Sequence, residues 1–140
     1  MPKNSNDELY SYIDADKNLE NDLKLSYDRL DLIRNYIEIY KKVSNSLENV
    51  DGSGDEKEVL IPLGGNVMLP ATIKTSDSAI VGLGAGVYKE MKREKIQKKT
   101  EERIKNLYTI ENDILDKISD ISVKKLFIEA KIKELSENVR

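Results

Sequence analysis

The chain has 140 residues, of which 35% are charged and 6% are aromatic, and its formal net charge is −3. It contains no Cys, His or Trp, which excludes thiol catalysis and disulfides and removes the commonest metal ligand and general base. We therefore expect no catalytic residue, no metal and no cofactor. The acidic balance argues against nucleic acid as a partner. No apolar run is long enough to span a membrane, and residues 1–7 are polar and unlike a signal peptide, so a cytoplasmic protein is expected.

Helix-breaking residues are confined to the middle of the chain. Apart from Pro2, every Gly and Pro lies between residues 52 and 86, which leaves about fifty breaker-free residues on each side. Such runs greatly exceed an average helix of roughly 11–12 residues. We predict one mainly helical α+β domain over 1–140. It comprises a helix over 7–50, a linker over 51–57, strands over 58–88 and a second helix over 89–139.

The first flank has the seven-residue apolar repeat of a coiled coil. Asn6-Asp7-Glu8, with acids in the first turn, is typical of a helix start. Nine of the twelve positions that form the predicted seam are apolar or aromatic. These positions are Leu9, Tyr12, Asp16, Leu19, Leu23, Ser26, Leu30, Ile33, Ile37, Tyr40, Ser44 and Leu47.

The second flank repeats the pattern, with nine apolar residues at eleven positions. Its positions are Ile104, Leu107, Glu111, Ile114, Ile118, Ile121, Lys125, Ile128, Ile132, Leu135 and Val139. Each helix would be roughly 60–70 Å long, and the two can zip together antiparallel. This pairing places Asp16 opposite Lys125, both polar exceptions in the seams. We interpret them as a pair that fixes the register, with two separately solvated charges as the alternative.

A second apolar stripe runs along the first helix. Leu25, Leu32 and Ile39 are seven residues apart, and Tyr36 and Val43 lie beside them. A two-helix hairpin needs only one seam, so this stripe is expected to cover either the strands or another subunit. We favour another subunit.

The middle of the chain changes to short β-prone runs separated by Gly64-Gly-Asn and Thr75-Ser-Asp-Ser, which are turn signals. Four strands in two hairpins are therefore predicted. Pro62 and Pro70 cannot donate to a ladder and are expected at an edge, a strand end or a bulge.

Two glycine-containing segments of the middle invite functional interpretations that their context does not support. Gly82-Leu-Gly-Ala-Gly86 is a partial dinucleotide fingerprint, but the third Gly comes one residue too early and no βαβ unit follows. It is interpreted as a tight turn or bulge. Asp51-Gly-Ser-Gly-Asp55 is a linker rather than a Ca²⁺ loop, because Pro62 stands at the twelfth position, where such a loop needs Glu.

Two surfaces remain as candidates for binding. Residues 89–105 hold eight Lys/Arg against four Glu, and a solvated helix face is favoured over a dock for an acidic partner. The free ends of the paired helices carry many apolar side chains, more than the frayed ends of a two-stranded coil can bury. These are either ordinary seam residues or an adhesive tip for apolar clients. The set is Leu9, Tyr10, Tyr12, Ile13, Ile128, Ile132, Leu135 and Val139.

The order helix, two hairpins, helix resembles the α-type subunit of prefoldin over nearly the whole chain. The resemblance is most specific where Ile61-Pro-Leu-Gly64 opens the strands and Val81-Gly-Leu-Gly-Ala-Gly-Val87 closes them. It implies an ATP-independent co-chaperone. In the archaeal type, two α and four β subunits join their strands into a double β-barrel that carries six coiled coils. The distal coil tips hold unfolded proteins, which pass to a group II chaperonin.

Under this resemblance the strands are the assembly surface, and they need neighbouring chains to close their open edges. The assembly residues it implies are Val59, Ile61, Leu63, Val67, Leu69, Ile73, Ile80, Val81 and Val87. The alternative is a structural coiled-coil adaptor that oligomerises through the same strands. An enzyme has no supporting arrangement of residues.

Overall fold

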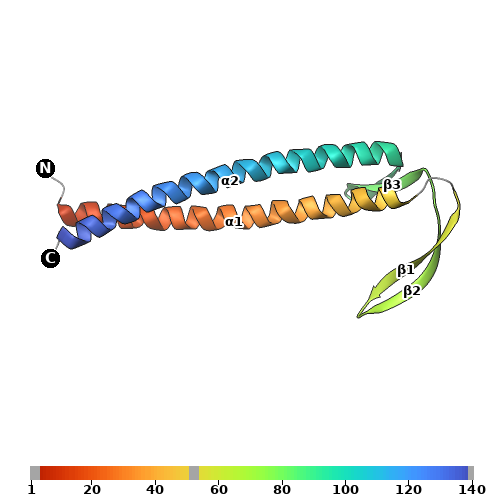
Figure 1. The fold of residues 1–140 in the computed structure, drawn as a ribbon, viewed down its shortest axis with the longest axis horizontal. Coiled ribbons are helices and arrows are strands. Elements are labelled where there is room, and N and C mark those ends of the chain that lie inside the picture. Colours follow the sequence, from red (N-terminus) through yellow and green to blue (C-terminus); the bar gives the residue numbers. More distant parts are fainter. Residues whose placement is uncertain (1–3, 51–53, 139–140) are drawn as a thin grey trace. The chain divides into compact units, whose positions relative to one another are not determined.

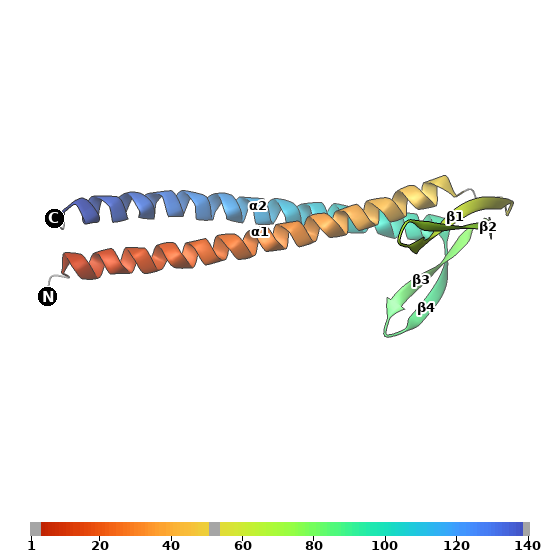
Figure 2. The ribbon, with the colours of Figure 1, turned by 90° about the horizontal axis from the view of Figure 1, so that it is seen from below.

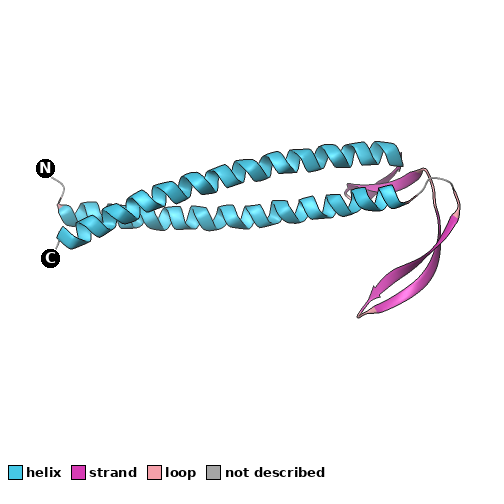
Figure 3. Cartoon of the chain, in the orientation of Figure 1, coloured by secondary structure: helices cyan, strands magenta, loops and turns pink. Residues whose placement is uncertain are grey.

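The computed structural model describes residues 4–50 and 54–138 (Figure 1). Its elements follow the order α1 (Ser5–Asn49), β1 (Glu56–Gly64), β2 (Val67–Lys74), β3 (Ser78–Gly84), β4 (Val87–Lys92) and α2 (Arg93–Asn138). The predicted fold class, two long helices with two small antiparallel hairpins between them, is confirmed (Figure 3).

The strands extend further than the sequence analysis expected. β1 already begins at Glu56, within the expected linker, of which residues 51–53 lie outside the described residues. β4 continues to Lys92, so that the first four residues of the basic run are strand rather than helix. The reason is register, because β3 offers a pairing partner as far as Ser78↔Lys92. The Arg93 N–H then donates to the Asp77 carbonyl at 2.8 Å, where α2 starts.

The chain divides into two compact units. Unit 1 consists of Met1–Ile37 with Asn106–Arg140, and unit 2 is Glu38–Lys105. In unit 1 the two helices lie side by side and antiparallel (Figures 1 and 2). Every predicted seam position of unit 1 within residues 4–37 and 106–138 is buried or half-buried. Its most buried side chains are Ser26, Leu30, Ile37, Leu107, Ile118 and Ile121.

Unit 2 contains the four strands, which form two separate two-stranded antiparallel sheets, β1–β2 and β3–β4 (Figure 2). Met91 of β4 and Ile96 of α2 are its buried apolar side chains. Thr75 is buried at the base of the first hairpin, where its N–H and its hydroxyl both donate to the Asp55 carbonyl, at 3.0 and 2.8 Å.

The helix seam of unit 2 contains polar residues of α2 that precede Ile104, the first predicted seam position of this helix. Within this unit the Gln97 Nε2 donates to the Ser44 Oγ at 2.8 Å, and Thr100 is buried. Ser44 lies 28 residues after Asp16, and Gln97 lies 28 residues before Lys125. Both pairs therefore keep the same register over four heptads, although apolar spacing alone did not reveal the polar one.

Both hairpins turn through glycine-rich segments with the same geometry. Positive φ angles occur at Gly64, Gly65 and Asn66 in the first turn and at Gly84, Ala85 and Gly86 in the second. Each hairpin has a register shift just before its turn, between Pro62 and Gly64 and between Gly82 and Gly84. The interpretation of the second glycine run as a turn with a bulge is confirmed, and so is the position of Pro62 at a bulge.

The predicted meeting of Asp16 and Lys125 is confirmed. The Lys125 Nζ lies 3.1 Å from the Asp16 Oδ1 and 2.8 Å from the Glu129 Oε1, and both members of the inter-helix pair are half-buried. The hydrogen bonds that the Lys125 ammonium donates, first to Glu129 and then to Asp16, hold its pKa above the ordinary value of 10.5. Since this pKa is raised on folding, its contribution to stability is complete below pH 10.5 and is lost only as the pH rises through the raised pKa.

This geometry predicts unequal effects for the two single substitutions. Asp16→Leu leaves Lys125 paired with Glu129 and adds an apolar seam residue, so the Tm should rise by a few degrees. Lys125→Leu leaves the Asp16 carboxylate half-buried with no cation beside it, so the Tm should fall. Thermal unfolding followed by helicity measures both. Equal Tm changes would show that the two charges are independently solvated.

Candidate functional site

The two hairpins expose apolar side chains on both faces. Along β1, for example, Leu60 and Ile61 point to opposite faces of a two-stranded sheet, and both are exposed. Each hairpin pairs only with itself, so each strand also has one edge without a neighbour among the described residues. Apolar side chains on both faces are typical of strands buried between other layers. The hairpins therefore have the exposed apolar surface that is typical of a protein–protein interface.

The assembly residues implied by the sequence divide into two groups. Six are exposed: Ile61, Leu63, Val67, Leu69, Ile80 and Val87. Val59, Ile73 and Val81 are half-buried. Val81 lines a small hollow of unit 2 together with Tyr40 of α1, Met91 of β4 and Ile96 of α2. Four further apolar residues of the strands are exposed and were not predicted, namely Leu60, Met68, Leu83 and Tyr88.

The predicted tip residues occupy different positions in unit 1. Tyr10 is 65% exposed, whereas the others within the described part of the chain are half-buried between the helices, as the seam interpretation expects. The half-buried set is Leu9, Tyr12, Ile13, Ile128, Ile132 and Leu135. Val139 lies outside the described residues.

An exposed apolar patch on α2 was missed. Val123, Leu126 and Phe127 are each at least 60% exposed, and the spacing of three and four residues places them together on one helix face. The Lys131 Nζ lies 5.8 Å from the centre of the Phe127 ring. The sequence carried the signal, since these residues fall outside the seam positions and Phe127 is the only Phe of the chain.

The stripe of α1 formed by Leu25, Leu32, Tyr36, Ile39 and Val43 is exposed along its whole length, from 38% for Val43 to 62% for Leu25. It does not line the seam with α2. Asp22, Leu25, Asp28, Arg29 and Leu32 line a shallow groove together with Lys117 of α2, which places a hollow on this face of unit 1.

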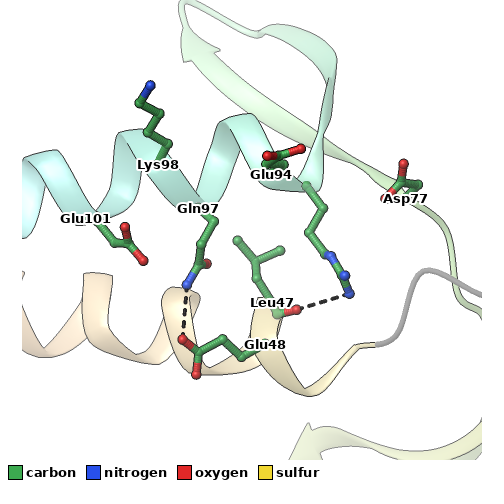
Figure 4. Close-up of a pocket in the computed structure, with 8 residues that line it drawn as sticks. Leu47, Glu48, Asp77, Glu94, Gln97, Lys98 and Glu101 are labelled. Atoms are coloured by element: carbon green, nitrogen blue, oxygen red, sulfur yellow. Dashed lines mark hydrogen bonds between the residues drawn. The ribbon is translucent and has the colours of Figure 1, made fainter.

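A polar hollow lies where α1 ends and α2 begins in unit 2 (Figure 4). The Gln97 Nε2 donates to the Glu48 Oε1 at 3.4 Å, and the Arg93 Nη1 donates to the Leu47 carbonyl at 3.4 Å (Figure 4). Glu94, Lys98 and Glu101 line the rest with mixed charge. These contacts hold the helix ends together beside the hairpins. The Gln97 Oε1 is buried without a hydrogen-bond partner, which is the one unsatisfied buried side-chain atom in residues 4–50 and 54–138.

Two further properties bear on function. Within the described ranges, no three acidic side chains are close enough together to hold a metal ion. No described helix combines the length and the apolar content that crossing a membrane requires.

The family model described as prefoldin subunit matches residues 19–138. A solved structure, described as filamentous PFD from Methanocaldococcus jannaschii, superposes with a TM-score of 0.61 at 22% sequence identity. It covers 86% of this chain and 98% of its own chain. At this identity the superposition establishes a shared fold. No curated protein sequence matches.

Proposed function

The chain belongs to the prefoldin subunit family, and from this premise we propose that it is an ATP-independent co-chaperone subunit that holds unfolded proteins. The family is one of chaperone subunits rather than enzymes. The observation that carries the proposal is the patch of Val123, Leu126 and Phe127, which is exposed on a helix whose seam is already filled by other residues.

The patch suits clients that have no defined shape. Apolar side chains on a helix surface bind non-directionally, so they accept any segment that exposes apolar groups. Tyr10 adds an exposed aromatic side chain in the same unit. The half-buried tip residues Leu9, Tyr12, Ile13, Ile128, Ile132 and Leu135, with Val139, form the client surface with them when the helix ends part. Several arms in one assembly supply avidity for a client that each arm holds weakly.

Assembly is proposed to run through the hairpins. Two hairpins per chain resemble the α-type subunit, and this supports an α₂β₄ hexamer with β-type subunits in which the strands close into a β-barrel. Barrel closure would cover both the open edges and the exposed apolar faces. Held clients would pass in the cytoplasm to a group II chaperonin.

A double substitution on α2 tests client binding. Leu126→Glu with Phe127→Glu should leave the helicity and the size of the complex unchanged, because both side chains point away from the seam. Protection of a denatured test protein from aggregation should weaken about tenfold or more, since each buried apolar side chain contributes about 1.5–3 kcal/mol. Light scattering during dilution of the test protein from denaturant measures the protection.

The matched control adds the same two charges at polar exposed positions of α2, as Asn112→Glu with Ser119→Glu. It should protect as well as the unmodified chain. If the Leu126 and Phe127 variant also protects fully while remaining assembled, the co-chaperone proposal gives way to the structural adaptor.

A further inference from the structure

The exposed stripe of α1 has the spacing of a second coiled-coil seam. Positions 25, 29, 32, 36, 39 and 43 alternate in steps of four and three residues, and five of the six are apolar. Arg29 is the exception. This alternation is the knob pattern that a packed helix follows on another helix. A loop or a sheet laid along α1 would not select it.

The occupant of the stripe is therefore a helix, and the charges of α1 indicate which one. In a parallel pairing with a second copy, equal positions meet, and Arg29 would lie against Arg29. In an antiparallel pairing centred between Leu32 and Tyr36, Arg29 lies against Ile39 and its long stem can cover apolar surface. Leu25 then meets Val43, and Leu32 meets Tyr36.

The residues that flank the stripe match this antiparallel arrangement. Asp28, Asn35 and Lys42 are seven residues apart and exposed along its outer side. In an antiparallel pair, this flank of one helix lies next to the same flank of the other copy. Asp28 of one copy then faces Lys42 of the other, twice by symmetry, and Asn35 faces Asn35 at the two-fold axis. Opposite charges at flanking positions set orientation in coiled coils.

We propose that α1 pairs antiparallel with α1 of a second copy of this chain, through Leu25, Leu32, Tyr36, Ile39 and Val43. The groove beside Leu25 and Leu32 gives the second helix a hollow to enter. The stripe is about 27 Å long, which is short for an interface that must hold two proteins together alone. The pairing therefore joins arms of two separate assemblies, where repeated weak contacts add up. It uses none of the hairpin or α2 patch residues on which the proposed function rests.

Cysteine cross-linking tests the orientation directly, because the chain has no native Cys. The purified full-length chain carries Asn35→Cys, Asp28→Cys or Lys42→Cys and is treated with a short bismaleimide. Asn35→Cys should cross-link to itself. Asp28→Cys should not, since its two copies lie about 21 Å apart along the helices, fourteen residues in register. A mixture of Asp28→Cys and Lys42→Cys should cross-link.

The control is Asp31→Cys, exposed on another face of α1, which should remain monomeric on a denaturing gel. Adding Leu32→Lys to Asn35→Cys should abolish the cross-link while the helicity of the chain stays unchanged. Self-cross-linking of Asp28→Cys, equal cross-linking at residue 31, or absence of the Asn35→Cys product would each overturn the proposal.

Discussion

Leu60→Lys and Ile80→Lys are expected to abolish assembly while both helices remain folded. The two residues are 63% and 74% exposed and occupy equivalent positions, twenty residues apart, in the two hairpins. Their side chains do not contribute to the helix seam, so loss of apolar character there leaves the isolated chain intact. In the proposed barrel the same side chains would be covered by neighbouring strands.

The expected loss of assembly is large because each substitution weakens every contact that the hairpins make with neighbouring subunits. Burying a Leu or Ile side chain contributes about 1.5–3 kcal/mol, and burying an unpaired ammonium in its place adds a further penalty. A loss of about 3 kcal/mol at one contact weakens it about 100-fold. Co-expression with a β-type subunit, followed by native mass measurement, should show free subunits in place of the complex.

Thr72→Lys supplies the matched control. Thr72 is an exposed polar residue on the same face of the first hairpin as Leu60, two pairs away in the ladder. This variant should assemble normally. A complex that survives both Leu60→Lys and Ile80→Lys would show that subunits associate without burying these faces.

The helix seam could be predicted from the sequence because two features constrain it. These are the seven-residue apolar repeat and the position of the hairpins in the middle of the chain. Once the breakers place the strands in the middle, the antiparallel partner of each position follows, which is how Asp16 was matched with Lys125. The polar seam residues of α2 in unit 2 were not predicted, because the prediction relied on the spacing of apolar residues. Gln97 donates a hydrogen bond to Ser44 of α1, and Thr100 is buried in unit 2. Neither side chain is apolar, so neither appears in a search for apolar spacing.

The prediction of the tip rests on proximity to the chain ends, which does not decide which way a side chain points. Ile128 and Ile132 are seam residues and face the other helix wherever they lie along it. Leu126 and Phe127 adjoin Ile128 in sequence but fall outside the seam, and both are at least 60% exposed. Helix phase, rather than distance from the ends, separates the surface from the seam.

Leu107→Ala is expected to lower the free energy of unfolding by about 2–5 kcal/mol, the usual range for a buried leucine. Leu107 is 3% exposed and lies in the seam of unit 1. Against a typical total of about 5–15 kcal/mol, this loss removes a large part of the stability. Urea denaturation followed by helicity should show a lower midpoint with an unchanged slope.

Leu126→Ala removes the same atoms from the surface of the same helix. Because Leu126 is 68% exposed, its effect on the free energy of unfolding should stay within about 0.5 kcal/mol. The two variants should therefore behave oppositely in the aggregation assay below their melting temperatures. Leu107→Ala should still protect the test protein, and Leu126→Ala should protect it less. Equal losses of stability would mean that the surface patch is buried in the protein as it exists in solution, and that another subunit rather than a client covers it.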